Sequence, residues 1–257
     1  MKPILDKSMF RDATTDSGSL SVMSSIVHRI TEPGEYYGII YRETEKAGSF
    51  QLRVCGGSEP PEGGEKGPVQ ANIDLVSLTP PCGSTGGYPT LFLLQTGGFL
   101  IFSVPTGSGE FAVELFCTGK KKKPEMVFDS RRLSSGDIFL THVLRPGTYS
   151  VRDSLGHGQA DLTVSYPEPG KTVCRVQPVL VECKEGSINP GKIQILPAQA
   201  LMFSCFRECR ITIELKKADD RPRPPRSRVF AQAAGKRKKR AEKHATKGFM
   251  RKIRFAG

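Results

Sequence analysis

Cysteine is the residue type whose spacing in this sequence comes nearest to a known kind of site. Cys205 and Cys209 lie four positions apart in "SCFREC", and Cys174 and Cys183 precede them. Structural zinc sites usually draw their thiolates from two pairs, each spaced about two to four residues apart. Only one pair here has that spacing. We therefore expect small cysteines buried in strands rather than a thiolate zinc site, and we predict no metal and no cofactor.

The histidines do not form a catalytic pattern with other residues. They are His28, His142, His157 and His244. A nucleophilic Ser or Cys needs a base and an orienting carboxylate, and the sequence assigns no such set. The acidic residues are scattered, and no Gly-rich phosphate loop ends in Lys-Ser or Lys-Thr. We therefore predict that the protein is not an enzyme.

Basic residues are concentrated at the C-terminal end. From Lys216 onwards there are 16 Lys or Arg residues and 3 acids, whereas the remaining 22 basic and 23 acidic residues nearly cancel. Dense Lys and Arg neutralise phosphates and release counterions, and Arg-rich disordered segments fold on RNA. We predict that this tail binds nucleic acid, RNA or DNA, without strong sequence preference. The residues expected to do so are Arg226, Arg228, Lys236, Arg237, Lys238, Lys239, Arg240, Lys243, Lys247, Arg251, Lys252 and Arg254.

Two other functions fit the same charge distribution. A structural or assembly subunit of a shell or particle would point the tail towards an anionic cargo. A membrane-surface adaptor would lay the tail's Lys, Phe and Ile residues on acidic lipid. In each case the body would serve protein partners or self-association as a homo-oligomer. The run "GKKKKP" (119–124) is typical of a solvated loop, with a nucleic-acid face as the alternative.

The sequence predicts a cytoplasmic protein. Its first residues lack the apolar segment of a signal peptide, and no apolar run reaches the length of a membrane span. Seven cysteines without regular spacing do not match a secreted disulfide framework. The cluster "KRKKR" (236–240) is typical of a nuclear localisation signal, so a nuclear location is expected if the host is eukaryotic.

Alternating apolar and polar residues predict strands from residue 19 to about 215. The clearest examples are "FQLRV" (50–54), "FAVEL" (111–115), "ADLTVSY" (160–166), "KIQIL" (192–196) and "ITIEL" (211–215). Period-two alternation bounded by Gly, Pro and Ser is typical of half-buried strands. The chain also has 27 Gly and 19 Pro, which favours a turn-rich all-β fold over a helical one.

A motif of the form Pro-Gly-x-Tyr occurs twice before a strand, in "EPGEYYGI" (32–39) and "LRPGTYSV" (144–151). Pro-Gly suits the two central positions of a type II turn. The Tyr ring would be buried while its hydroxyl reaches a backbone group, as at the corners of Greek-key sandwiches. His28 and His142 precede the two motifs at similar distances, so we expect them at equivalent positions.

A second motif repeats at an offset of about one hundred residues. Phe-Ser recurs at 102–103 and 203–204, and Glu-Leu recurs at 114–115 and 214–215. The order of the half-units predicts two Greek-key β-sandwich domains. One would combine 10–60 with 174–217, the other would be the inserted segment 73–168, and 218–257 would form a flexible basic tail. A domain-swapped dimer would satisfy the same halves between two chains.

The central unit resembles the cupredoxin-like sandwich, although Ig-like sandwiches use similar turns. The resemblance rests on "FDSRRLSSGDIFLTHVLRPGTYSV" followed by "LGHG" and "LTV", which places His157 where the family has a loop histidine. It covers the central unit, and the outer unit is less similar. Blue copper needs two His, one Cys and a weak Met ligand. No Cys follows Tyr149 in this loop and no Met follows His157 before the last strand closes, so the resemblance implies a scaffold without the metal.

Overall fold

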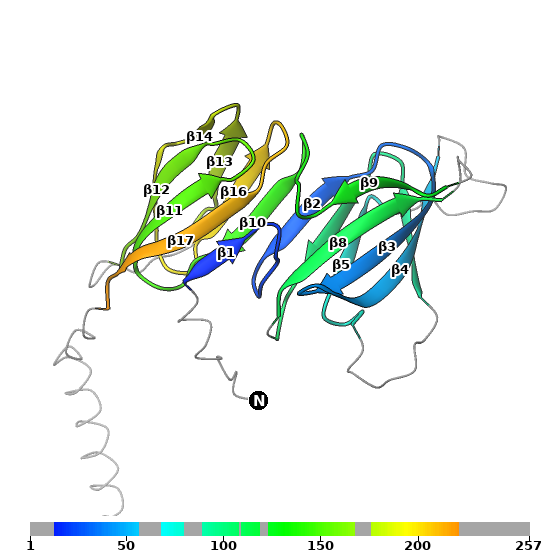
Figure 1. Cartoon of the computed structure of the whole chain (residues 1–257), viewed down its shortest axis with the longest axis horizontal. Helices are drawn as coiled ribbons and strands as arrows, with labels where there is room; N and C mark the ends of the chain where they lie inside the picture. The colour runs from blue at the N-terminus through cyan, green and yellow to red at the C-terminus, as the bar shows by residue number, and fades with distance from the viewer. Residues whose placement is uncertain are drawn as a thin grey trace, which may run out of the picture. The chain divides into compact units, whose positions relative to one another are not determined.

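The computed structural model describes residues 13–56, 68–79, 89–107, 109–118, 123–167 and 176–220. Within these ranges the protein is all-β, as predicted, and contains no helix. It accordingly has no helix there that is long and apolar enough to span a bilayer. The strands form one seven-stranded sheet and two five-stranded sheets (Figure 1).

The three sheets are named here by their size or by a central strand. The seven-stranded sheet has the order β14-β13-β16-β10-β2-β7-β5, the β3 sheet the order β6-β4-β3-β8-β9, and the β11 sheet the order β1-β17-β11-β12-β15. In chain order the strands are Thr14–Asp16 (β1), Ser25–Arg29 (β2), Gly34–Arg42 (β3), Glu45–Cys55 (β4), Gln70–Asp74 (β5), Thr90–Gln95 (β6), Phe99–Ser103 (β7), Phe111–Cys117 (β8), Glu125–Asp129 (β9), Ile138–His142 (β10), Gly147–Asp153 (β11), Gln159–Val164 (β12), Val179–Lys184 (β13), Ser187–Asn189 (β14), Lys192–Ile195 (β15), Ala200–Cys205 (β16) and Ile211–Ala218 (β17).

Alternating burial explains why these segments are strands. In β15 and β16 every second residue is buried, as the period-two pattern requires. The buried faces belong to one apolar core. Phe102 of β7 lies 6.1 Å from Phe50 and 5.4 Å from Phe128, between ring centroids. Because Phe50 and Phe128 belong to the β3 sheet, this sheet and the seven-stranded sheet pack face to face like the layers of a β-sandwich.

The two halves of the described body repeat the same strand pairings. The antiparallel pairs β3–β4, β3–β8 and β2–β7 correspond to β11–β12, β11–β17 and β10–β16. The parallel pairs β4–β6 and β5–β7 correspond to β12–β15 and β13–β16. β2 and β10 also pair with each other, and Ile26 lies opposite its own counterpart Phe139 at the centre. The pairings of the two halves are therefore related by an approximate two-fold.

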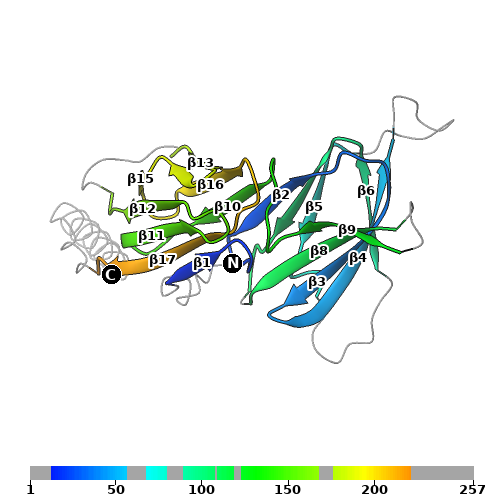
Figure 2. The same ribbon diagram turned by 45° about the horizontal axis from the view of Figure 1, so that its top comes forward.

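The first strand of each half is exchanged with the other half. β1 begins the first half but pairs with β17, the last strand of the second (Figure 2). Its counterpart β9 begins the second half but pairs with β8, the last strand of the first. Each five-stranded sheet therefore ends in a strand that belongs by sequence to the opposite half.

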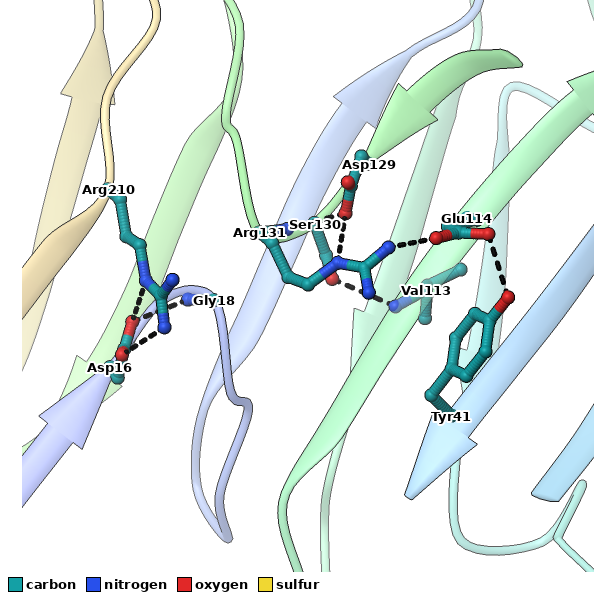
Figure 3. Close-up of polar contacts among 9 residues, drawn as sticks. All are labelled: Asp16, Gly18, Tyr41, Val113, Glu114, Asp129, Ser130, Arg131 and Arg210. Carbon is teal, nitrogen blue, oxygen red and sulfur yellow. Dashed lines mark hydrogen bonds and ion pairs between the residues drawn. The ribbon is translucent and has the colours of Figure 1, made fainter. Parts of the chain in front are cut away.

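Two buried serines anchor the exchanged strands. Ser17 follows β1 and Ser130 follows β9, and neither side chain is exposed to solvent. The Ser17 hydroxyl accepts the backbone N–H of Ile211 at 2.9 Å. The Ser130 hydroxyl accepts that of Val113 at 2.8 Å, as Figure 3 shows. Ile211 is the first residue of β17 and Val113 lies within β8, so each serine satisfies a buried donor of the partner strand.

Ion pairs accompany the serines (Figure 3). The Arg210 guanidinium donates to both carboxylate oxygens of Asp16, at 3.0 and 2.7 Å. At the other junction Arg131 donates to Asp129 and to Glu114. Since all these side chains are partly exposed to solvent, we attribute the anchoring mainly to the buried serines.

The observed pairing corrects the predicted division into domains. Of the contacts expected between 10–60 and 174–217, that of β1 with β17 is present. However, β3 and β4 pair with β8 and β6 from the predicted central unit 73–168, and β11 of that unit pairs with β17. The other strands of each half pair mainly within that half, since segments close in sequence pair readily, and the first strand of each half pairs with the last strand of the other.

One of the two sequence landmarks is also corrected. Phe102 and Phe203 face corresponding positions of β2 and β10, so the Phe-Ser motif marks equivalent residues. The counterpart of Leu115 in β17 is Ile213 and not Leu215. Leu115 and Ile213 face equivalent positions, one on β3 and the other on β11. The connection from β16 to β17 is shorter than that from β7 to β8, which shifts the Glu-Leu motif out of register.

The two Pro-Gly-x-Tyr corners behave alike. Tyr36 and Tyr149 are buried, and their hydroxyls donate to the backbone carbonyl four residues upstream at 2.8 and 2.6 Å. Gly34 and Gly147 both have φ of 155°, which glycine adopts readily but which differs from the value of about 80° in a type II turn. The tyrosine contacts are therefore as predicted, and the turn type is not.

Candidate functional site: a polar pocket beside a histidine–aspartate pair

A histidine and an aspartate from different halves meet next to the two-fold. His28 lies on β2, and Asp137 directly precedes β10. The Nδ1 of His28 is 2.7 Å from Oδ1 of Asp137, whose side chain is 2% exposed. The second carboxylate oxygen accepts the backbone N–H of Ser134 at 2.7 Å. Because a carboxylate only accepts, His28 donates this hydrogen bond through Nδ1.

The ring of His28 is also fixed by an aromatic contact. Its centroid lies 4.3 Å from that of Phe128 on β9, which in turn stacks on Phe102. The imidazole is therefore held at its edge by Asp137 and on its face by an exchanged strand. Such support from two sides preorganises a side chain for binding or proton transfer.

His28 lines a pocket of about 490 Å³ at the edge of the β3 sheet. This volume lies in the range of small-molecule sites. β2 and the segment that follows it form one wall, while β3, β8 and β9 contribute the other. The lining residues are His28, Arg29, Ile30, Thr31, Glu32, Tyr36, Cys117, Glu125 and Val127.

Tyr36 and Cys117 face each other across β3 and β8. Burial, followed by the nearby Cys117 and Glu32, raises the pKa of Tyr36 to about 12. The phenol therefore stays neutral at physiological pH and donates to the Glu32 carbonyl at 2.8 Å. Cys117 is a free thiol of intermediate exposure.

The related position in the second half is nearly filled. That cavity has a volume of about 30 Å³ and is lined by His142, Leu144 and Tyr149 among others. By strand pairing and loop register, Thr141, Leu144 and Leu215 take the places of His28, Thr31 and Cys117. Thr141 bonds Ser24, the counterpart of Asp137, at 3.1 Å. A neutral contact and two leucines thus replace the polar groups of the open pocket.

The predicted equivalence of His28 and His142 is wrong by one position. His142 corresponds to Arg29, and its Nδ1 lies 3.0 Å from the Met23 carbonyl. The two histidines consequently face different surroundings, because neighbouring residues of a strand point to opposite faces.

A second cluster of reactive side chains lies in the core of the second half. Cys183 and Cys205 pair across β13 and β16, and the sulfur atoms of Cys205 and Cys209 are 2.8 Å apart. All three are buried. Hydrogen bonds from Cys183 and then Cys205 lower the pKa of Cys209 to about 5, against the opposing effect of burial. The bond to Cys209 and burial raise the pKa values of the other two thiols.

The structure describes three of the four cysteines considered for zinc. Cys183 and Cys205 are buried in strands and Cys209 in the following turn, whereas Cys174 lies outside the described residues. In the part of the chain that the structure describes, no group of three or more His, Cys, Asp or Glu residues is arranged to hold a metal ion.

The remaining predicted site residues divide between a turn and the tail. His157 lies in the turn between β11 and β12, with φ of 61° and its N–H bonded to the Asp153 carbonyl at 2.9 Å. The twelve basic residues predicted to bind nucleic acid lie outside the described residues, as do His244 and most of the lysine run at 120–123.

The His28–Asp137 pair is the feature that sequence reasoning missed, because its members are 109 positions apart. The segment "DSGSLSVMS" (16–24) matches "DSRRLSSGD" (129–137) at a constant offset of 113, and aligning the two would have placed β2 beside its counterpart. The chain was compared with protein-family models, curated proteins and solved structures, and none of them matches it.

Proposed function

We propose that this chain is a non-enzymatic binding protein whose basic tail holds nucleic acid while the β body serves as a scaffold. One observation carries the proposal. The chain divides into units 1–219 and 220–257, and the charge divides at the same point. The second unit holds 14 of the 38 Lys and Arg residues and 2 of the 26 acids, so the first holds 24 of each and has no net charge.

The physical argument is electrostatic. A segment of 38 residues with formal charge +12 attracts phosphate from any sequence, and binding releases condensed counterions. A neutral body adds little to this attraction and little repulsion between copies. The separation of charge therefore supports a division of labour in which the tail supplies affinity and the body supplies partner choice.

For the body we propose two Greek-key sandwiches of cupredoxin-like or Ig-like type. The two buried tyrosine corners and the repeated strand pairings support this arrangement. A scaffold of this type presents edges and loops for protein partners.

Fluorescence anisotropy with labelled duplex DNA and single-stranded RNA tests the proposal. Replacing the five basic residues at 236–240 by Gln in the full chain is expected to weaken binding at least about tenfold at 0.1 M salt. If half of the tail's basic residues contact phosphates, the slope of log affinity against log salt for the unaltered chain is about −6 on duplex DNA.

The matched control is the lysine run at 120–123, replaced by Gln in a chain with an intact tail. It changes four basic residues of the neutral unit and is expected to leave affinity within about twofold. Unchanged binding by the tail variant, or a larger loss in the loop variant, would contradict the proposal.

A further inference from the structure

One face of the seven-stranded sheet is apolar but lies outside the core. Its strands point their buried residues, such as Ile26, Phe102 and Phe203, into the core. Neighbouring residues of a strand point to opposite faces, so the residues between these lie on the other side of the sheet. Six of them are large and apolar, and we name them the outer patch: Val27, Ile101, Ile138, Leu140, Leu180 and Met202.

All six side chains of the outer patch are partly exposed to solvent. Leu180 is 57% exposed, and the other five have intermediate exposure. Among the residues that the structure describes, the core and the apolar side chains packed against it include none of the six. Packing within the described body therefore does not explain why these positions are apolar.

The outer patch is continuous across five neighbouring strands and crosses the β2–β10 pair, where the two halves meet (Figure 2). Its members form two adjoining rows, which β10 joins because it contributes one residue to each. The rows are Leu180–Met202–Leu140 on β13, β16 and β10, and Ile138–Val27–Ile101 on β10, β2 and β7.

The outer face of the β11 sheet shows which side chains this protein places against water. Alternation along β11, β12 and β17 turns polar residues outward, among them Arg152, Asp161, Thr163 and Glu214. A sheet face that meets solvent is expected to be polar in this way. The apolar outer patch departs from that expectation, as a surface covered by a partner does.

Polar residues frame the outer patch at both edges of the sheet. Asn72 on β5 and Ser187 on β14 are exposed, and Lys184 of β13 donates to Glu182 at 2.8 Å. An apolar centre within a polar rim is typical of a protein–protein interface. The partner that fits the centre is therefore another protein surface that is flat and apolar.

We propose that the outer patch binds the same patch of a second copy of this chain, so that two seven-stranded sheets stack face to face in a dimer. The seven strands, about 4.8 Å apart and about 17 Å long, make a face of about 550 Å² in projection. Two such faces bury about 1,100 Å², which reaches the roughly 1,000 Å² that a specific interface needs.

A second copy suits the patch in symmetry and in charge. The two-fold relation between the halves matches Val27 and Ile101 with Leu140 and Met202, so the patch is similar on both sides of its centre. Isologous dimers pair such a surface with itself. The unit 1–219 has no net charge, so two copies meet without net repulsion. The dimer gives the proposed scaffold a partner and does not depend on nucleic-acid binding by the tail.

Sedimentation equilibrium of the nuclease-treated full chain tests the dimer in about 0.5 M salt, which screens the charges of the tail. The expected mass is twice the 28.1 kDa of one chain. Leu140→Glu is expected to raise the dissociation constant of the dimer about hundredfold or more, because each dimer would bury two carboxylates without partners. A natural chain that stays monomeric at about 100 μM, well above the micromolar dissociation constants of weak interfaces, would overturn the proposal.

The matched control is Thr163→Glu, which places the same carboxylate on the polar outer face of the β11 sheet. It is expected to keep the dissociation constant within about twofold, as surface substitutions away from an interface do. Circular dichroism checks each fold, and Met202→Glu repeats the measurement if Leu140→Glu is unfolded. A folded variant of either residue that dimerises as tightly as the natural chain would also overturn the proposal. All these variants keep the tail, so their nucleic-acid affinity tests the proposed function separately.

Discussion

Single residues join the two halves through contacts that pair distant positions. Ser17 bonds the N–H of Ile211 and Ser130 that of Val113, both in the interior. Around the two-fold, the pair Ser24–Thr141 corresponds to Asp137–His28. Equivalent positions thus carry a neutral contact on one side of the two-fold and an ionisable contact on the other. The Ser24 and Thr141 hydroxyls satisfy each other without any charge, whereas His28 and Asp137 place two ionisable side chains at the equivalent positions.

Ser130→Ala is expected to lower the free energy of unfolding by about 1–3 kcal/mol, because it leaves the N–H of Val113 buried without an acceptor. Urea unfolding followed by circular dichroism measures this, since the chain has no Trp. The exposed Ser187 is the matched control, and its change to Ala is expected to stay within about 0.5 kcal/mol. Equal effects of the two substitutions on the free energy of unfolding would show that the Ser130 hydrogen bond does not stabilise the protein.

The thiol cluster makes stability depend on pH. The pKa of Cys209 falls from 9.0 to about 5 in the folded protein. A depressed acid pKa adds stability that is complete above the unfolded value and is lost as pH falls through the folded value. We expect the free energy of unfolding to rise between pH 5 and pH 9 more steeply in the natural chain than in Cys209→Ala.

The control for this pH dependence is Cys55→Ala, which removes an exposed thiol and is expected to keep the steeper rise. The pKa values of Cys183 and Cys205 are raised above the unfolded value of 9.0, so above pH 9.0 these two thiols make the free energy of unfolding fall as pH rises. The comparison therefore ends at pH 9. Parallel curves for the natural chain and Cys209→Ala would mean that Cys209 remains a neutral thiol.

At the scale of elements, sequence patterns predict strands and corners but not partners. Alternation identifies β8, β12, β15 and β17, and Pro-Gly-x-Tyr identifies the buried corners of Tyr36 and Tyr149. The exchange of β1 and β9 has no such signal, because each has only a few residues, β1 pairs with a strand about two hundred residues away, and the hairpin of β8 and β9 looks like any local pairing. The pocket depends on that exchange, since Glu125 and Val127 line it from β9.

Deleting residues 1–17 is expected to uncover the edge of β17. An unpaired edge exchanges its amide hydrogens faster and invites association with other chains. Hydrogen exchange should therefore speed up in β17 with little change in β8, whose partner β9 remains. Deletion of residues 1–12 alone, which leaves β1 in place, is the control. Unchanged exchange in β17 would mean that β1 contributes little to this sheet.

For the molecule as a whole, the repeat and the exchange make each half incomplete without the other. The first half lacks the β9 strand that covers β8, and the second lacks the β1 strand that covers β17. We expect fragments 1–120 and 121–219, produced together, to copurify as a one-to-one complex, because β1, β9 and the β2–β10 pair all cross between them. Sedimentation analysis measures the stoichiometry. Starting the first fragment at residue 18 instead is expected to weaken the complex about tenfold or more, and two fragments that fold as independent monomers would refute the idea that the exchanged strands unite the halves.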